Sequence, residues 1–470
     1  MKKNIIKTVL SAAVLMSVFL FYLSCGKTNA ASMTPTTTIV LQAPNAGFSY
    51  EVLFEPIVEF HGEAFPVKIL STATRNTSLD GSSRMIATAD FFGDSLGDFG
   101  VTLSLNGSSG DTVPVRVEIE GDRFIRKSGI DVIMPLNRKI EIFPRISYDY
   151  NALERLVQPA SENVYFRLLY GSVAVSEKME VVRFHSVNEV PFYIADKNGE
   201  SVEDYTWLFA AYVNEDDPLI DTILKEALQI GVADRIGFGN TFSFSGYQIE
   251  DEYGDSGSSV DLQVLSIWSV FLNHNIKYSN ITTTSTANNM MLTQYVRTLG
   301  ESFGNSQANC LDGSVLFASV LRKLGIDPFL VIVPGHMFVG YIRDYDPFSI
   351  GFLETTMMGN VDISRHTRDD SILGRIKNWT GIGRTQSSVT VDSFRDAQTA
   401  GEERFYIATV EKLFDGISDE NEQQEVWDKF WDEVQSFDDI FELWNEEYDL
   451  YAIIDISFWR SAGIMPVTRY

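Results

Sequence analysis

The stretch "QANCLDGSVLFASVLRKLGI", Gln307 to Ile326, decides which fold the sequence predicts for the region around it. Asn309 is a favoured N-cap residue, and the carboxylate of Asp312, at the third helical position, can accept a hydrogen bond from the cap amide. Apolar residues then recur at helical spacing as far as Gly325, which suits the position after a C-cap. The stretch therefore predicts a helix that starts at Cys310.

Cys310 is one of two cysteines in the 470-residue chain. The first amide N–H groups of a helix lack internal partners, and the helix dipole places partial positive charge there. This setting favours the thiolate form of a cysteine, and the same N–H groups can hold an oxyanion. A lone cysteine is commonly a small core residue, but the residues that follow favour a reactive site around Cys310.

His336 is the best placed of the five histidines to act as a base. It separates two β-like runs, "DPFLVIVPG" and "HMFVGYI", which together predict a hairpin with His336 at the start of its second strand. A third run, "IGFLETT", carries Glu354 onto a neighbouring strand. A helix-start cysteine, a strand histidine and an acid on the next strand predict a Cys310–His336–Glu354 relay.

The segment "NCLDGSVLFASVLRKLGIDPFLVIVPGHMFVGY…FLETT" resembles bacterial transglutaminase-like proteins, most clearly from Gly246 to Thr356. The resemblance implies a papain-like fold in which Cys310 is the nucleophile, His336 the base and Glu354 the orienting acid. The family more commonly has Asp in the third place, so the other acids that could fill it are Asp346 and Asp362.

Papain-like sites also use an upstream polar side chain at the oxyanion, and the resemblance makes Gln307 and Gln294 the candidates for this support. Asp312 is a further supporting residue, which we interpret as a helix cap rather than as a catalytic acid. We expect no metal at Cys310, Asp312 and His336, because structural zinc needs four ligands and cysteine and histidine are scarce in this chain. The sequence also predicts no cofactor.

The N-terminus, "MKKNIIKTVLSAAVLMSVFLFYLSC", has a basic start and a short apolar run, which is typical of a signal peptide. Its end, "YLSC", resembles a bacterial lipobox, although Tyr22 stands where Leu is usual. We expect a lipoprotein signal peptide at residues 1–24, a lipid on Cys25 and a linker at 25–35. The alternative is an ordinary signal peptide that is cut near Ala30 or Ala31. The resemblance implies an extracytoplasmic protein of the bacterial cell envelope, tethered to a membrane by its lipid.

Residues 36–190 alternate between apolar and polar side chains, as in "PVRVEIEGD", with turn residues at regular intervals. This pattern predicts an antiparallel β-sandwich of the Ig-like kind. The expected fold class is therefore α+β. The sandwich precedes a papain-like, transglutaminase-like α+β domain at 200–385 and a helical C-terminal region at 386–470.

Helical spacing predicts helices over Asp217–Gly231 and, more deeply buried, over Val260–Asn280. The stretch Asn288–Ser302 is interpreted as another helix or a helix with a loop. Residues 415–449 are acidic, with aromatic side chains at helical spacing. We interpret them as an amphipathic insertion with a solvated acidic face; the alternative is a docking surface for a basic partner.

The net charge of −27 argues against nucleic acid or anionic lipid as a partner. The residues and the resemblance together predict a cysteine enzyme that attacks an amide, peptide or ester carbonyl of a protein or peptide substrate. Hydrolysis is expected over transfer to an amine, because water is abundant outside the cell. The alternative is a non-catalytic binding or scaffolding lipoprotein that retains the fold.

Overall fold

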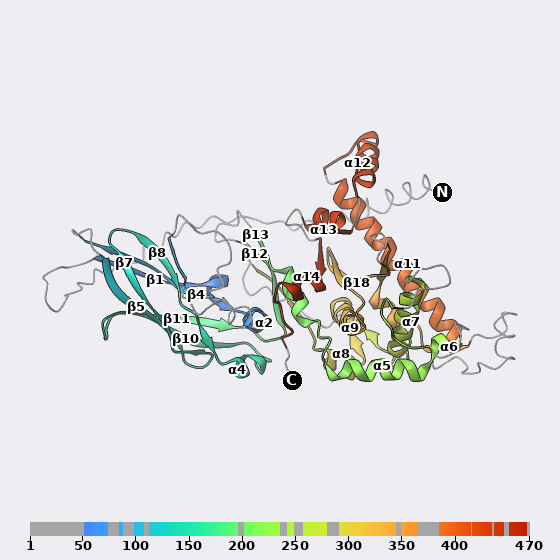
Figure 1. Ribbon diagram of the computed structural model, residues 1–470, viewed down its shortest axis with the longest axis horizontal. Helices are drawn as coiled ribbons and strands as arrows, with labels where there is room; N and C mark the ends of the chain where they lie inside the picture. Colours follow the sequence, from blue (N-terminus) through green and yellow to red (C-terminus); the bar gives the residue numbers. More distant parts are fainter. Residues whose placement is uncertain are drawn as a thin grey trace.

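The computed structural model describes residues 51–73, 84–87, 98–107, 112–195, 202–235, 242–248, 257–279, 291–344, 349–363, 385–414, 416–434, 437–445 and 451–467. In these ranges the protein is α+β, with several separate sheets (Figure 1). The expected signal peptide and linker, Cys25 and Asp346 lie outside the described residues. No helix within the described ranges has the length and apolar character to cross a bilayer.

Two sheets form the N-terminal part of the molecule (Figure 1). One has the strand order β1-β4-β8-β3, and the other has the order β2-β11-β10-β5-β7. Their strands pair antiparallel, except that β2 and β11 run parallel. The strand bounds are Glu51–Val58 (β1), Glu63–Ala64 (β2), Arg84–Ala87 (β3), Phe99–Asn106 (β4), Thr112–Gly121 (β5), Ser128–Pro135 (β7), Lys139–Phe143 (β8), Ala160–Tyr170 (β10) and Val173–Phe184 (β11).

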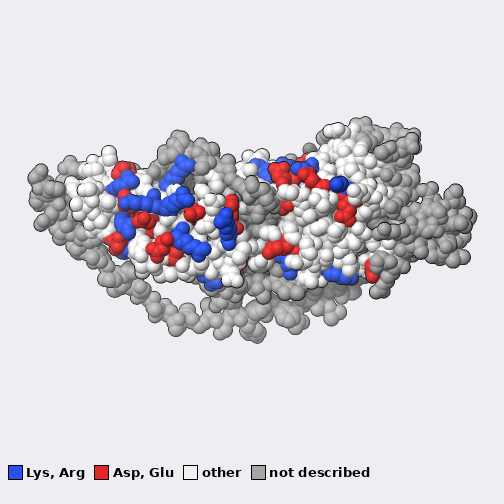
Figure 2. Space-filling model, turned by 90° about the horizontal axis from the view of Figure 1, so that it is seen from below, with Lys and Arg blue, Asp and Glu red and all other residues white. Residues whose placement is uncertain are grey.

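Strand β5 shows how the alternating pattern builds these sheets. Its Val115, Val117 and Ile119 are buried, while the residues between them point to the other face. That other face carries cross-strand and neighbouring ion pairs, namely Arg116–Asp131, Lys127–Glu118, Arg167–Glu120 and Arg167–Glu177. Figure 2 shows basic and acidic side chains interspersed over this part of the molecule, so its surface carries charges of both signs.

A three-stranded sheet with the order β13-β12-β15 connects the two parts of the chain. The expectation of a helix at the start of Asn288–Ser302 is wrong, because β15 occupies that position and α8 begins only after the capping residue Thr298. Strand β15 forms because it pairs with β12, about a hundred residues earlier, a partner that the local sequence does not reveal. The bounds are Glu189–Ala195 (β12), Val202–Asp204 (β13), Met291–Tyr295 (β15) and Leu299–Gly304 (α8).

The second part of the molecule packs helices on a sheet with the order β19-β18-β17-β20 (Figure 1). The predicted helix over Asp217–Gly231 is confirmed as α5. The predicted helix over Val260–Asn280 is confirmed as α7 only as far as Asn273, because Lys277–Tyr278 form the strand β14. Trp268 of α7 is fully buried, with its ring 5.9 Å from that of Phe317 on α9. The bounds are Pro218–Ile230 (α5), Gly257–Asn273 (α7), Lys277–Tyr278 (β14), Gln307–Ala308 (β16), Cys310–Lys323 (α9), Pro328–Val333 (β17), His336–Ile342 (β18), Ile350–Leu353 (β19) and Ala452–Asp455 (β20).

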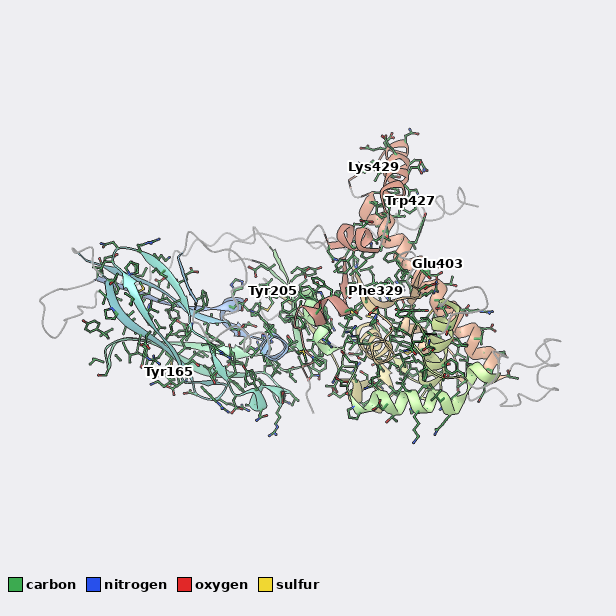
Figure 3. The ribbon with its side chains drawn as sticks, viewed as in Figure 1. Tyr165, Tyr205, Phe329, Glu403, Trp427 and Lys429 are labelled. Atoms are coloured by element: carbon green, nitrogen blue, oxygen red, sulfur yellow. The ribbon has the colours of Figure 1, made fainter. Side chains whose placement is uncertain are left out.

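Helix α11 (Gln386–Leu413) lies against β19, and β20 pairs antiparallel with β17. Residues on both sides of position 385 therefore build one sheet. The acidic stretch forms α12 (Glu420–Glu433) and α13 (Phe437–Asn445). Their apolar side chains join a cluster with the sheet that includes Val434, Ile440, Trp444, Phe329 and Phe338. Figure 3 shows Trp427 and Lys429 farther out, on α12.

Candidate active site

Helix α9 begins at Cys310, as the sequence predicts. The amide of Asp312 donates to Asn309 Oδ1 (2.7 Å), and the amide of Asn309 donates to Asp312 Oδ2 (3.1 Å), which completes a capping box. Asp312 is buried, and its Oδ2 also lies 2.7 Å from Arg297 Nη1. The carboxylate of Asp312 therefore caps the helix and pairs with Arg297.

The position of His336 follows from the hairpin that the sequence predicts. Strands β17 and β18 pair antiparallel, with Val333 opposite His336. The turn between them contains Gly335 at φ 73°, a left-handed conformation that favours glycine. His336 is consequently the first residue of β18, and its side chain is 15% exposed.

Glu354 directly follows β19, and its carboxylate contacts the imidazole of His336. Its Oε2 lies 2.7 Å from Nε2 of His336. Its Oε1 accepts hydrogen bonds from the amide (3.1 Å) and the hydroxyl (2.5 Å) of Thr356. The carboxylate is 3% exposed. Glu354 is the acid that the described structure places against His336.

The side chain of Cys310 lies close enough to the same imidazole to raise its pKa. Since Nε2 faces Glu354, Nδ1 is the ring nitrogen left for the sulfur. Burial opposes the charged imidazolium, but the hydrogen bonds and charges of Cys310 and Glu354 outweigh it and raise the pKa of His336 to about 9. Burial likewise works against the ionised form of Glu354, yet His336, Thr356 and Arg404 lower the pKa of this carboxyl below its ordinary value.

The thiol is partly exposed and stands at the positive end of α9. The capping box uses the amides of Asn309 and Asp312, and the amide of Gly313 donates to the carbonyl of Asn309. The amides of Cys310 and Leu311 take no part in these bonds. They are therefore available to a carbonyl oxygen that becomes negatively charged next to the sulfur.

The two glutamines suggested by the resemblance differ in their surroundings. Gln307 is exposed in β16, two residues before the N-cap of α9. The side-chain amide of Gln294 donates to the carbonyl of Tyr295 at 3.0 Å, so this amide is already engaged. Gln307 is the more exposed of the two.

Two residues near the site carry no signal in the sequence. Tyr278 is 47% exposed in β14, which pairs with β16 just before α9. Its pKa is raised by burial and then by the charges of Cys310 and Glu354. Arg404 of α11 places Nε 2.7 Å from Oε2 of Glu354.

The described ranges contain no group of three or more His, Cys, Asp or Glu side chains that could hold a metal ion. The chemistry open to this arrangement is that of a thiol with an adjacent base and a fixed acid. No protein-family model matches the chain, and no curated protein matches it in sequence.

Proposed function

We propose that this protein is a cysteine hydrolase that cleaves an amide, peptide or ester bond through Cys310, His336 and Glu354. The observation that carries the proposal is the position of His336. Its ring contacts the Cys310 side chain and the Glu354 carboxylate, at the start of α9. A nucleophile, a base in hydrogen-bond reach and an orienting acid are the parts that covalent acyl chemistry needs.

In the proposed reaction, the Cys310 thiolate attacks the carbonyl carbon of the substrate and forms a C–S bond. The amides of Cys310 and Leu311 hold the oxyanion. When the C–N or C–O bond breaks, the His336 imidazolium gives its proton to the leaving group. Water then attacks the thioester, His336 takes a proton from that water, and the C–S bond breaks to release the acid and the thiolate.

The same chemistry with an amine in place of water would transfer the acyl group. We favour hydrolysis because the thiol is partly exposed to solvent. The proposed fold is a papain-like, transglutaminase-like domain behind an Ig-like β-sandwich. The proposed location is the bacterial cell envelope, with a lipid on Cys25 and a protein or peptide as substrate.

The pH dependence of thiol alkylation tests this proposal. Iodoacetamide should label Cys310 of the purified mature chain rapidly at about pH 6 to 7, because the proposed role of His336 is to activate the sulfur. His336→Ala should slow labelling at that pH, and Cys310→Ser should abolish it. A rate that rises only near the ordinary thiol pKa of about 8.5 and ignores His336→Ala would contradict the proposal and favour a non-catalytic binding protein.

An activity-based thiol probe on whole cells tests the location together with the nucleophile. The wild type should be labelled in the membrane fraction and Cys310→Ser should not. Cys25→Ala should move the labelled protein out of that fraction. Labelling that stays with the membrane in Cys25→Ala would overturn the lipid anchor and leave the nucleophile unaffected.

A further inference from the structure

Helix α11 contacts the end of β19 and the adjoining Glu354 at three positions, which lie on one face of the helix. The carbonyl of Ala397 accepts a hydrogen bond from the amide of Glu354 at 3.0 Å. Gly401 packs against the end of β19, and Arg404 reaches the Glu354 carboxylate. These contacts are spaced four and then three residues apart, which puts them on the same side of an α-helix.

The close approach of α11 requires a glycine. A Cβ on Gly401 would lie 2.9 Å from the backbone nitrogen of Leu353 and 2.9 Å from Cβ of Phe352. Real side chains do not fit at that distance without movement of the strand or the helix. Gly401 thus lets the helix axis come near enough for Arg404 to reach Glu354.

Arg404 and His336 share one oxygen of Glu354. Both Arg404 Nε and His336 Nε2 lie 2.7 Å from Oε2, while Oε1 is taken by Thr356. Glu354 is 3% exposed and Arg404 is 48% exposed, so the guanidinium stands between the buried carboxylate and solvent. Figure 3 labels its neighbour Glu403 on the same stretch of α11.

This sharing matters because the charge on His336 must change during the proposed reaction. When the imidazolium gives up its proton, a carboxylate with no other cation would be left buried and uncompensated, which is unfavourable. A guanidinium stays charged throughout and holds a fixed geometry. We propose that Arg404 is a positioning residue of this site, which keeps Glu354 ionised and in place while His336 gains and loses its proton.

The inference rests on the proposed function, and it also makes a prediction of its own. Removing a positive charge beside Glu354 should stabilise the protonated forms of the neighbouring carboxyl, imidazole and thiol. The pH profile of Cys310 reactivity should therefore move to higher pH without Arg404. A residue that only holds the fold together would change the amount of folded protein and leave the profile in place.

The experiment compares iodoacetamide rate constants against pH for the full mature chain, with folding of each variant checked by circular dichroism. Arg404→Met should lower the rate on the acid limb by about tenfold, which corresponds to one pKa unit. Arg404→Gln, which keeps hydrogen-bond donors but not the charge, should shift the profile in the same direction. Arg404→Lys should recover most of the wild-type profile.

Arg395→Met is the matched control, because Arg395 is exposed on the same helix and its removal takes away the same charge. Its profile should match the wild type. An unshifted profile in a folded Arg404→Met or Arg404→Gln variant overturns the inference, as does an equal shift in Arg395→Met. A wild type without early labelling overturns the proposed function instead, so the two failures are distinguishable.

Discussion

At the scale of single residues, Glu354 concentrates the contacts of the candidate site. Four donors from three residues reach its two oxygens, His336 and Arg404 on one, and the amide and hydroxyl of Thr356 on the other. The carboxylate is buried, so its bonds to His336 and Thr356 are little weakened by water, whereas the Arg404 guanidinium is half exposed. Its charge and its length should therefore both be critical.

Changing Glu354 separates these two properties. Glu354→Gln removes the charge that stabilises the imidazolium, so Cys310 should react about tenfold or more slowly near neutral pH. Glu354→Asp keeps the charge but is shorter by one methylene, so its Cys310 should react at a rate between those of the wild type and Glu354→Gln. Iodoacetamide kinetics measure both. Equal rates in all three proteins would show that this acid does not act on the thiol.

Sequence reasoning found part of this site and missed part. Cys310, His336 and Glu354 could be predicted because a cap signal, a hairpin and a third β-run lie close together in the chain. Arg404 could not be predicted, because an ion pair with Glu354, fifty residues away, leaves no spacing pattern. Tyr278 was missed for the same reason, since its position depends on the pairing of β14 with β16.

At the scale of elements, the site depends on how helices meet strands. Helix α9 supplies the sulfur, β18 the imidazole and the end of β19 the acid, while α11 packs across β19. Local sequence predicted α5, α7, α9 and the β17–β18 hairpin, whose signals are periodicity and caps. Strands β15 and β20 form by pairing with strands that are distant in the sequence, so the local sequence does not predict them.

Gly401→Ala tests whether the α11–β19 approach controls the site. The added Cβ would overpack the contact and cost about 1–3 kcal/mol of unfolding free energy. It should also slow the labelling of Cys310 at pH 6, because α11 would carry Arg404 away from Glu354. Urea denaturation and alkylation kinetics measure the two effects.

Gly304→Ala is the control for this change, since Gly304 is a helix glycine with nothing within 4 Å of its added Cβ. It should leave labelling unchanged and keep or raise stability by up to about 1 kcal/mol. A Gly401→Ala protein with wild-type labelling would mean that the site tolerates movement of α11.

At the scale of the whole molecule, the two parts are joined by buried charge and by late segments of the chain. His185 is fully buried between Glu63 of β2 and Glu189 of β12, and its ring stacks on Phe65. Farther along, the amide of Met465 donates to the carbonyl of Ser71 at 2.9 Å, and that of Val467 donates to Ala211 at 2.9 Å. The ion pairs of His185 join β2 to β12, and the Met465 contact joins the end of the chain to the N-terminal part.

His185→Gln should destabilise the fold by about 3–5 kcal/mol at pH 6, because two largely buried carboxylates, 12% and 14% exposed, lose their shared cation. Burial opposes the charged ring, but Glu189 and Glu63 raise the pKa of His185 above 6.5. Its contribution is thus complete below pH 6.5 and is lost as pH rises through the folded-state pKa. Urea denaturation at several pH values should show that the difference in unfolding free energy between the wild type and His185→Gln becomes smaller as the pH rises.

The matching control is His274→Gln, whose ring is 33% exposed beside Glu226. A pair that reaches solvent contributes little, so this change should cost at most about 1 kcal/mol at any pH. If the difference in unfolding free energy between the wild type and His185→Gln does not change with pH, His185 is not the charged partner of the two carboxylates.

The placement of α11 also has a consequence for when the site can be completed. Synthesis delivers residues in numerical order, so the sulfur, the imidazole and the acid emerge before the helix that steadies them. A polypeptide that ends before α11 thus carries the sulfur, the imidazole and the acid without Arg404. The full set of contacts on the Glu354 carboxylate can therefore form only after Gln386–Leu413 has been made.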